Sequence, residues 1–322
     1  MRFLKYMTLL LAAVFLAGCA STGQSQTKVE LIQSETRSSS GPQARDLKIL
    51  TTSRHLADMI QALTEPNHAV EYMAESEEQL KSIAPDPAMM EELEYDAFFY
   101  IGAGYEPFIR EFTEALNKNR IYVGNVSRGI DIKRHQVNKL DIENYYYLTN
   151  STNYKIGLNS IKNALTELDP ARRSLYNENF GKLSKEIDDM QAEIRSFMEG
   201  HSEVLFIADS DLVSYAVREY GRSFMTMTQF TEVMAKQANN GTQSSGTVSA
   251  ASTGAPFSAM ETGESRVFLY SEDASIQKYS EDIIRYGLLP VKIHLYHEDL
   301  TLMDSFYSTF REVRKVIETR NP

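Results

Sequence analysis

The sequence predicts an α/β protein in which two α/β lobes with mainly parallel sheets are joined by one long helix. Strand-like and helix-like segments alternate over residues 47–126 and again over residues 201–322. Between these regions, apolar side chains in residues 169–200 recur at steps of three and four, which is the period of a helix. The chain has 322 residues, of which 42% are hydrophobic, and this is enough to form two cores.

Each lobe is expected to contain βαβ units, because strands alternate with helices at short spacing. For the first lobe we expect strands at 47–52, 70–73, 96–101 and 121–126, helices at 56–63, 88–93, 107–116 and 152–168, and a crossing loop at 127–143. For the second lobe we expect strands at 204–208, 224–230, 266–270 and 290–294, and helices at 212–220, 274–286 and 303–319.

Residues 169–200 predict a single helix of roughly 45 Å, with about 1.5 Å of rise per residue. Asp169 is expected to be the N-cap, Pro170 the first helical residue and Gly200 the left-handed residue at the C-terminus. The apolar stripe consists of Tyr176, Phe180, Leu183, Ile187, Met190, Ile194 and Phe197. A helix of this length is either a coiled-coil arm or a strut across two domains. We favour the strut, because no partner helix is evident.

The N-terminus predicts a lipid anchor. Arg2 and Lys5 precede a short apolar run, and the run ends in Leu16-Ala17-Gly18-Cys19, which matches the lipobox of bacterial lipoproteins. Cys19 is the only cysteine, so we expect it to be the site of lipid attachment. An uncleaved anchor helix is the alternative, and it would also place the protein outside the cytoplasm.

These features divide the chain into expected segments. Residues 1–18 are a lipoprotein signal peptide, and residues 19–46 are a lipidated, flexible tether rich in Ser, Gln, Thr and Gly. The lobes are 47–168 and 201–322, the linking helix is 169–200, and a low-complexity insert occupies 237–258. We therefore expect a protein anchored by lipid to a bacterial membrane, in the periplasm or at the cell surface.

Composition and motifs exclude several functions. The net charge of −11 and the pI of about 5.2 make nucleic acid an improbable partner. The single cysteine leaves no CxxC metal site in the folded body. No Gly-x-Ser-x-Gly, P-loop, Rossmann fingerprint or His-Glu-x-x-His occurs, and we expect no enzyme activity.

Several segments resemble the zinc- and manganese-binding lipoproteins of ABC importers. They are Thr51-Thr52 with Leu56-Ala57-Asp58, residues 96–107 ending in Gly104-Tyr105-Glu106-Pro107, Ser127-Arg128-Gly129-Ile130, residues 164–176, and Tyr215 with Arg218, Tyr220 and Gly221. The resemblance implies a periplasmic-binding-protein-like fold of the helical-backbone type, a ligand cleft at the lobe interface, and an ABC permease and ATPase as partners.

That family holds its metal with three histidines and a carboxylate, or with two of each. This sequence departs from the pattern at each of the loops where the resemblance places a donor, so the metal site is expected to be degenerate. The candidates for the cleft are Lys81, Ser82, Tyr145, Ser210, Asp211, Tyr270, His294 and Tyr296. Only His294 and Asp211 are weak metal candidates, because serine and tyrosine hydroxyls are poor ligands for divalent first-row metals. We expect no cofactor and no tight binding of zinc or manganese.

Three further patterns leave alternatives open. The His294-Leu-Tyr-His297-Glu298-Asp299 run is either a metal cluster or the end of a strand that meets solvent. The run Tyr145-Tyr146-Tyr147 either lines a cleft for an organic ligand or packs at the lobe interface. The acidic run 75–78 is either a solvated helix face or a cation-recruiting patch. Two functions remain: a solute-binding lipoprotein with a rebuilt site, or an interaction lipoprotein of the adhesin or envelope-assembly type on the same scaffold.

Overall fold

A computed structural model describes residues 43–92, 94–116, 121–137, 140–239 and 265–320. The expected signal peptide 1–18, the tether up to residue 42 and residues 240–258 of the expected insert lie outside the described residues. Residues 41–322 form one compact unit. No helix in the described part of the chain is long and apolar enough to cross a membrane.

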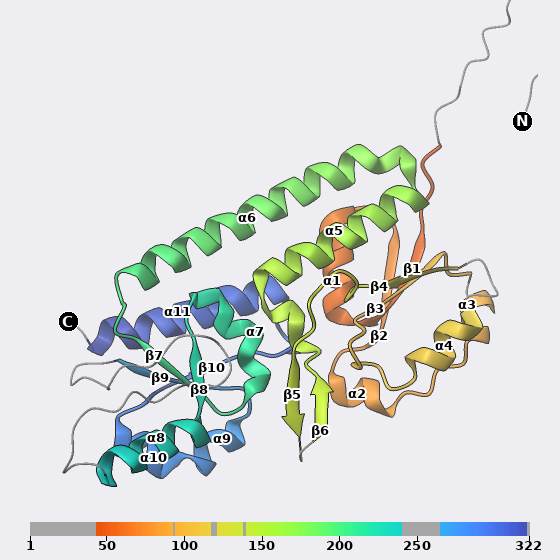
Figure 1. Ribbon diagram of the computed structural model, residues 1–322. Helices are drawn as coiled ribbons and strands as arrows, with labels where there is room; N and C mark the ends of the chain where they lie inside the picture. The colour runs from red at the N-terminus through yellow and green to blue at the C-terminus, as the bar shows by residue number, and fades with distance from the viewer. Residues whose placement is uncertain (1–42, 93, 117–120, 138–139, 240–264, 321–322) are drawn as a thin grey trace, which may run out of the picture. The chain divides into compact units, whose positions relative to one another are not determined.

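The first lobe is built on a four-stranded parallel sheet in the order β2-β1-β3-β4 (Figure 1). Its elements are β1 Lys48–Ser53, α1 Arg54–Thr64, β2 Ala69–Ala74, α2 Glu77–Ser82, α3 Ala88–Glu92, β3 Ala97–Tyr100, α4 Ile109–Leu116 and β4 Tyr122–Asn125. Strand β1 is buried at nearly every position because strands or helices cover it on all sides, which explains its run of Ile49, Leu50 and buried threonines.

The second lobe repeats this design with a parallel sheet in the order β10-β9-β7-β8. Its elements are β7 Leu205–Ala208, η3 Asp211–Val213, α7 Ser214–Val217, η4 Arg218–Tyr220, β8 Phe224–Thr226, α8 Met227–Asn239, β9 Arg266–Tyr270, α9 Asp273–Lys278, α10 Ser280–Tyr286, β10 Leu289–Lys292 and α11 Leu302–Arg320. These two sheets and the long helix confirm the predicted fold class.

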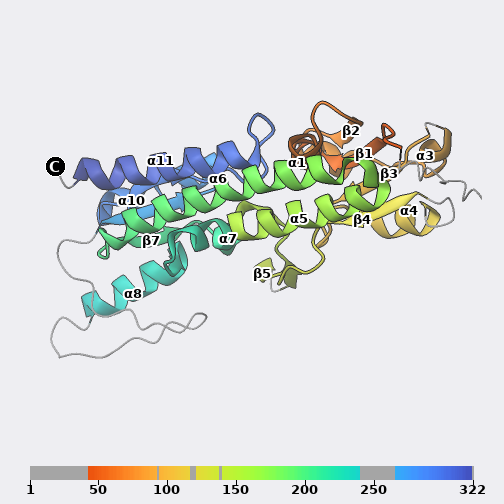
Figure 2. The same ribbon diagram turned by 90° about the horizontal axis from the view of Figure 1, so that it is seen from above.

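The two lobes are connected through η1 Tyr146–Thr149, α5 Ser151–Leu168, η2 Pro170–Arg172 and α6 Arg173–Glu199. Figures 1 and 2 show α6 running beside α5 and extending from the first lobe to the second, where α11 lies next to it. The predicted stripe faces inward: Tyr176, Ile187, Met190 and Ile194 are buried in a cluster that includes residues from both sheets. The helix is therefore a strut.

The ends of the long helix differ from the prediction. Asp169 does not cap α6: its Oδ2 accepts hydrogen bonds from Arg172 Nη1 at 2.8 Å and from the Tyr176 hydroxyl at 2.9 Å. A 3₁₀ turn over 170–172 precedes α6, and Gly200 has φ of −75°, which is right-handed. The prediction of a left-handed Gly200 was wrong, because glycine permits that conformation without requiring it.

Four other element predictions were wrong. Residues 127–143 contain an antiparallel hairpin, β5 Arg134–Val137 with β6 Leu140–Glu143, whose charged residues made it resemble a loop. The strand expected at 224–230 ends at Thr226, where Thr226 and Gln229 exchange side-chain and backbone hydrogen bonds that begin α8. The helix expected at 212–220 is three short pieces, and the helix expected at 274–286 is interrupted at Tyr279.

Candidate functional site

Four tyrosines, which we call the tyrosine cluster, meet where the lobes face each other: Tyr105, Tyr145, Tyr146 and Tyr296. Their ring centroids are 4.7 Å apart for Tyr145 and Tyr146, 5.2 Å for Tyr105 and Tyr145, 5.2 Å for Tyr146 and Tyr296, and 5.5 Å for Tyr105 and Tyr296. Most of these pairs are edge-to-face, the geometry that aromatic quadrupoles favour. Tyr296 comes from the second lobe, so the cluster fills the interface with rings from both lobes.

Turns at the ends of strands place these rings. Tyr105 follows β3 through a turn in which Gly102 has φ of +78°, and a Cβ on Gly102 would collide with the Asn125 side chain. Tyr296 follows β10 and has φ of +44°, which is uncommon for a residue with a Cβ. In parallel sheets, loops at the carboxyl ends of strands are where ligand sites form. Here the loops after β3 and β10 place the aromatic rings of Tyr105 and Tyr296 at this edge.

The Tyr296 hydroxyl also ties the lobes together through the backbone. It donates to the carbonyl oxygen of Tyr145 at 2.7 Å and accepts from the backbone N–H of Leu148 at 3.4 Å. Burial of Tyr296 raises the pKa of its phenol well above the ordinary value, so the hydroxyl remains a donor over the usual pH range. A phenol that donates in this way is not a metal ligand.

Glu77 is the acidic group next to the cluster. Its carboxylate accepts hydrogen bonds from the hydroxyls of Tyr145 at 2.7 Å and Tyr146 at 2.6 Å, and it pairs with the ammonium of Lys81 one helical turn away. Burial alone would raise the pKa of this carboxyl, but the hydrogen bonds from the ammonium and the two phenols outweigh burial and lower the pKa. The carboxylate is ionised and its acceptor positions face these partners.

A second carboxylate, that of Glu106, follows Tyr105 in the chain and is buried. It accepts from the Thr52 hydroxyl at 2.7 Å and from the backbone N–H groups of Ile101 at 2.7 Å and Gly102 at 2.9 Å. Its exposed fraction is 2%, and burial raises its pKa to about 7 in spite of these donors. This residue fixes the turn after β3 and does not face the interface.

One histidine of the first lobe packs against the cluster. His55, in the first turn of α1, is buried, and its ring centroid lies 5.4 Å from that of Tyr296. Burial lowers its pKa to about 4, so the imidazole is neutral at pH 7. His55 therefore contributes to the apolar packing of the interface.

Most residues predicted for the cleft lie elsewhere. Lys81 and Ser82 are exposed on α2, and the Ser82 hydroxyl donates to its own helix, at Gln79 O. Tyr270 ends β9 and stacks on Phe268, in a separate core cluster of the second lobe. Only Tyr145 and Tyr296 belong to the tyrosine cluster.

The two weak metal candidates have different surroundings. His294 lines a cavity of about 20 Å³ between the second lobe and α6, together with Ser305 and Ile194, and its ring meets that of His297 edge-on at 5.0 Å. Asp211 begins η3 beside strand β5, and the preceding Ser210 donates to Asp209 at 3.3 Å. Within the described residues, no group of three or more His, Cys, Asp or Glu side chains is placed to hold a metal ion.

Sequence reasoning missed Glu77, Tyr105 and His55 as part of this interface. The acidic run 75–78 was interpreted first as a solvated face, but Glu77 is half-buried and bonded to two tyrosines. The only local signal was the Glu77–Lys81 spacing of one helical turn. For the run Tyr145-Tyr146-Tyr147, in contrast, the predicted alternative of packing at the lobe interface describes the contacts that Tyr145 and Tyr146 make.

Comparisons with known proteins identify this architecture. The family model for the periplasmic zinc-uptake complex component A, ZnuA, matches residues 49–251. The chain belongs to this ZnuA family. Its members are solute-binding components of zinc uptake, so this protein is a binding protein and not an enzyme, as predicted. A comparison with curated proteins found no match.

Solved structures show the same fold at low sequence identity. A mutant of the laminin-binding adhesin Lmb from Streptococcus agalactiae has a TM-score of 0.62 and 12% identity, over 84% of this chain and 99% of that chain. The metal-dependent lipoprotein YcdH from Bacillus subtilis also has a TM-score of 0.62 and 12% identity, over 84% and 98%. The Pseudomonas aeruginosa binding protein FpvC, solved with Mn²⁺, has a TM-score of 0.61 and 14% identity, over 86% and 100%.

Proposed function

We propose that this ZnuA-family protein is a lipid-anchored, extracytoplasmic binding protein that does not carry zinc or manganese between its lobes. The observation that supports this proposal is the tyrosine cluster. The resemblance to the zinc- and manganese-binding lipoproteins leads us to expect imidazole and carboxylate groups at the lobe interface, and in this chain aromatic rings and a donating phenol pack there instead. A site for Zn²⁺ needs three or four deprotonated or imidazole donors.

The ionisable groups near the cluster already have other partners. Glu77 accepts from two phenols and an ammonium, and Glu106 accepts from a hydroxyl and two backbone N–H groups. A metal ion at either carboxylate would have to displace these hydrogen bonds, and those to the ionised Glu77 are charge-assisted and worth about 1.5–3 kcal/mol each. His294 and Asp211, the metal candidates among the predicted cleft residues, would not by themselves recover the cost of dehydrating the ion.

Calorimetric titration of chelator-treated protein with zinc and with manganese tests this proposal. We expect no one-to-one site tighter than micromolar. His294→Ala and the matched control His201→Ala should give the same weak heats as the unchanged protein. A one-to-one site tighter than micromolar would overturn the proposal, and its loss in His294→Ala alone would identify a ligand.

The lipid anchor is the second part of the proposal, and it rests on the lipobox at residues 16–19. Cys19→Ala should leave unprocessed or soluble protein, because the thiol that accepts the lipid is absent. Cell fractionation followed by detergent extraction measures this. If the variant were still processed and still required detergent, the anchor assignment would be wrong.

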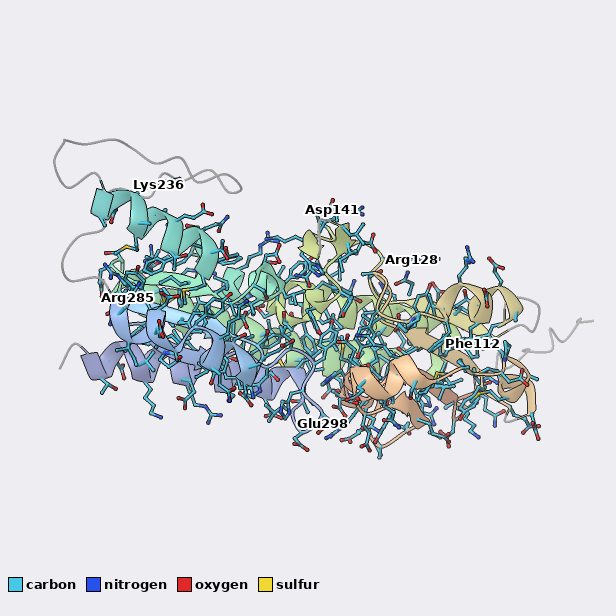
Figure 3. The ribbon with its side chains drawn as sticks, turned by 90° about the horizontal axis from the view of Figure 1, so that it is seen from below. Phe112, Arg128, Asp141, Lys236, Arg285 and Glu298 are labelled. Carbon is cyan, nitrogen blue, oxygen red and sulfur yellow. The ribbon has the colours of Figure 1, made fainter. Side chains whose placement is uncertain are left out.

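A role as an interaction lipoprotein, without transport, is the second candidate. It is favoured by the β5–β6 hairpin, which projects from the body of the protein and carries Asp141, labelled in Figure 3. Leu140 and Ile142 are 66% and 38% exposed on β6, and being two residues apart they share one face of the strand. Genes for a permease and an ATPase beside this gene would favour the receptor role, with those proteins as partners.

A further inference from the structure

A second cavity, far larger than the one at His294, lies between the linking helices and the second lobe. Its volume is about 440 Å³, which is within the size range of small-molecule sites. It is lined by the C-terminal half of α6, the first turn of α5, and η4 with the loop that follows it. We call it the arginine pocket, because Arg195, Arg218 and Arg222 line it.

Within the part of the chain that the structure describes, none of these guanidinium groups forms an ion pair with a carboxylate, although burial raises the pKa of the Glu219 carboxyl and the charge of Arg218 opposes that rise. Arg195 and Arg218 are exposed and make no side-chain hydrogen bond there, while Arg222 donates to the backbone carbonyl of Met198 at 2.8 Å. Guanidinium carries five N–H donors, so Arg222 keeps donors for a ligand after this bond. Elsewhere on the surface, Arg172 and Arg314 each contact carboxylates.

The carboxylates at the pocket do not neutralise these arginines by direct contact. Both carboxylate oxygens of Glu219 accept hydrogen bonds from the start of α5. The donors are Asn150 Nδ2 at 2.6 Å, the Ser151 hydroxyl at 2.6 Å and the Ser151 N–H. Glu199 is exposed and makes no ion pair among the described residues. Three guanidiniums against two carboxylates leave the pocket with a positive balance.

The remaining walls suit the body of an organic ligand. Met198 and Tyr220 have exposed fractions of 3% and 4% and form apolar lining. Thr152 accepts from Gln191 Nε2 at 3.1 Å, which leaves its own O–H free to donate.

We propose that the arginine pocket binds a small organic oxyanion, with its phosphate or carboxylate group held by Arg195 and Arg218 and its apolar body against Met198 and Tyr220. Arginine matches such groups because its planar fork donates two parallel hydrogen bonds. A bound anion would contact α5, α6 and η4 together, and so would bridge the link to the second lobe. This site is independent of the tyrosine cluster and of whether a metal binds there.

Calorimetry on the full-length lipoprotein in detergent, at constant ionic strength, tests the proposal with phenyl phosphate, benzoate and inorganic phosphate as probes. We expect saturable one-to-one binding of phenyl phosphate or benzoate, and weaker binding of inorganic phosphate, which cannot use the apolar lining. Preference between the first two identifies the acid group that the pocket favours. Arg195→Gln and Arg218→Gln should each weaken the organic anion about tenfold, the loss of one charge-assisted contact.

The matched control is Arg110→Gln, which removes an exposed guanidinium from α4 in the other lobe and should leave the affinity unchanged. Circular dichroism would confirm that each variant is folded. The proposal is overturned if none of the three probes saturates at millimolar concentration, if inorganic phosphate binds as tightly as the organic anions, or if Arg110→Gln weakens binding as much as the pocket variants do.

Discussion

The two lobes have the same sheet topology, with the first strand between the second and the third and the fourth strand beside the third. Each lobe also uses one carboxylate to join the ends of its first and third strands. In the first lobe, Glu106 follows β3 and accepts from Thr52 in β1. In the second lobe, Asp209 follows β7 and accepts from the N–H of Ser271, after β9, at 3.0 Å. The carboxylate follows the third strand in the first lobe and the first strand in the second lobe, but in both lobes it joins the ends of these two strands.

The lobes differ in what they present to each other. Tyr105 and Tyr145 come from the first lobe, Tyr146 begins the connection between the lobes, and the second lobe adds only Tyr296 to the cluster. A hydrogen bond also crosses the interface: the Arg54 guanidinium of α1 donates to the backbone carbonyl oxygen of Glu298, a residue that Figure 3 shows where the two lobes meet. The strand-end carboxylates stabilise each lobe by itself, so residues at the interface can change without loss of the fold.

The strut is what the lobes share, and a charge on its buried face should have the largest effect. Ile187 is fully buried in α6, so Ile187→Asp loses its packing and buries an unpaired carboxylate. We expect at least about 4 kcal/mol less free energy of unfolding. Chemical denaturation measures this, with the exposed neighbour Glu186→Ala as control. Equal stability of the two variants would refute the register of the stripe.

The sequence predicted the parts of the fold that depend on local pattern. The stripe on α6 is periodic within one helix, and the strand expected at 266–270 coincides with β9, whose central residues are buried. The β5–β6 hairpin was missed because its strands are short and charged and pack little apolar surface.

The candidate site depends on contacts between distant residues, and these have no local signal. Tyr145 meets Glu77 across 68 residues and Tyr296 across 151 residues. Their side chains could be identified by type, but the pairing of Tyr145 with Glu77 is decided by the folding of the first lobe, and its pairing with Tyr296 by how the lobes dock. The arginines of the second pocket come from α6, from η4 and from the loop after it, and no local pattern indicates that they line one pocket.

The second prediction asks whether the strand-end carboxylate of the second lobe has the role inferred from its contacts. Asp209→Ala removes the acceptor of the Ser271 N–H and of the Ser275 hydroxyl, which lies 2.8 Å away. We expect a loss of about 2 kcal/mol in the free energy of unfolding, because these donors lose their partner. Glu272→Ala is the control, since Glu272 is exposed and its side chain caps nothing. If both substitutions had the same cost, Asp209 would not join the strands.

The last prediction concerns the pH dependence of stability and uses Glu106→Gln, which changes the strand-end carboxylate of the first lobe. The pKa of Glu106 is about 7 in the folded protein against an ordinary 4.5, so between these values the folded state holds a proton that the unfolded state has released. Stability from this group therefore falls as pH rises through the window, by at most about 1.4 kcal/mol per pH unit. His55 has the opposite effect, because its pKa is lowered to about 4 and acid favours the unfolded state. In the unchanged protein the pH dependences from Glu106 and His55 overlap. Because His55 is present in both the unchanged protein and Glu106→Gln, its contribution cancels when the free energies of unfolding of the two proteins are subtracted. Relative to the unchanged protein, Glu106→Gln should thus gain stability steadily from pH 4.5 to 7, whereas the exposed control Glu114→Gln should show no such trend. Urea unfolding across this range measures the difference, and a value independent of pH would mean that burial does not keep Glu106 protonated.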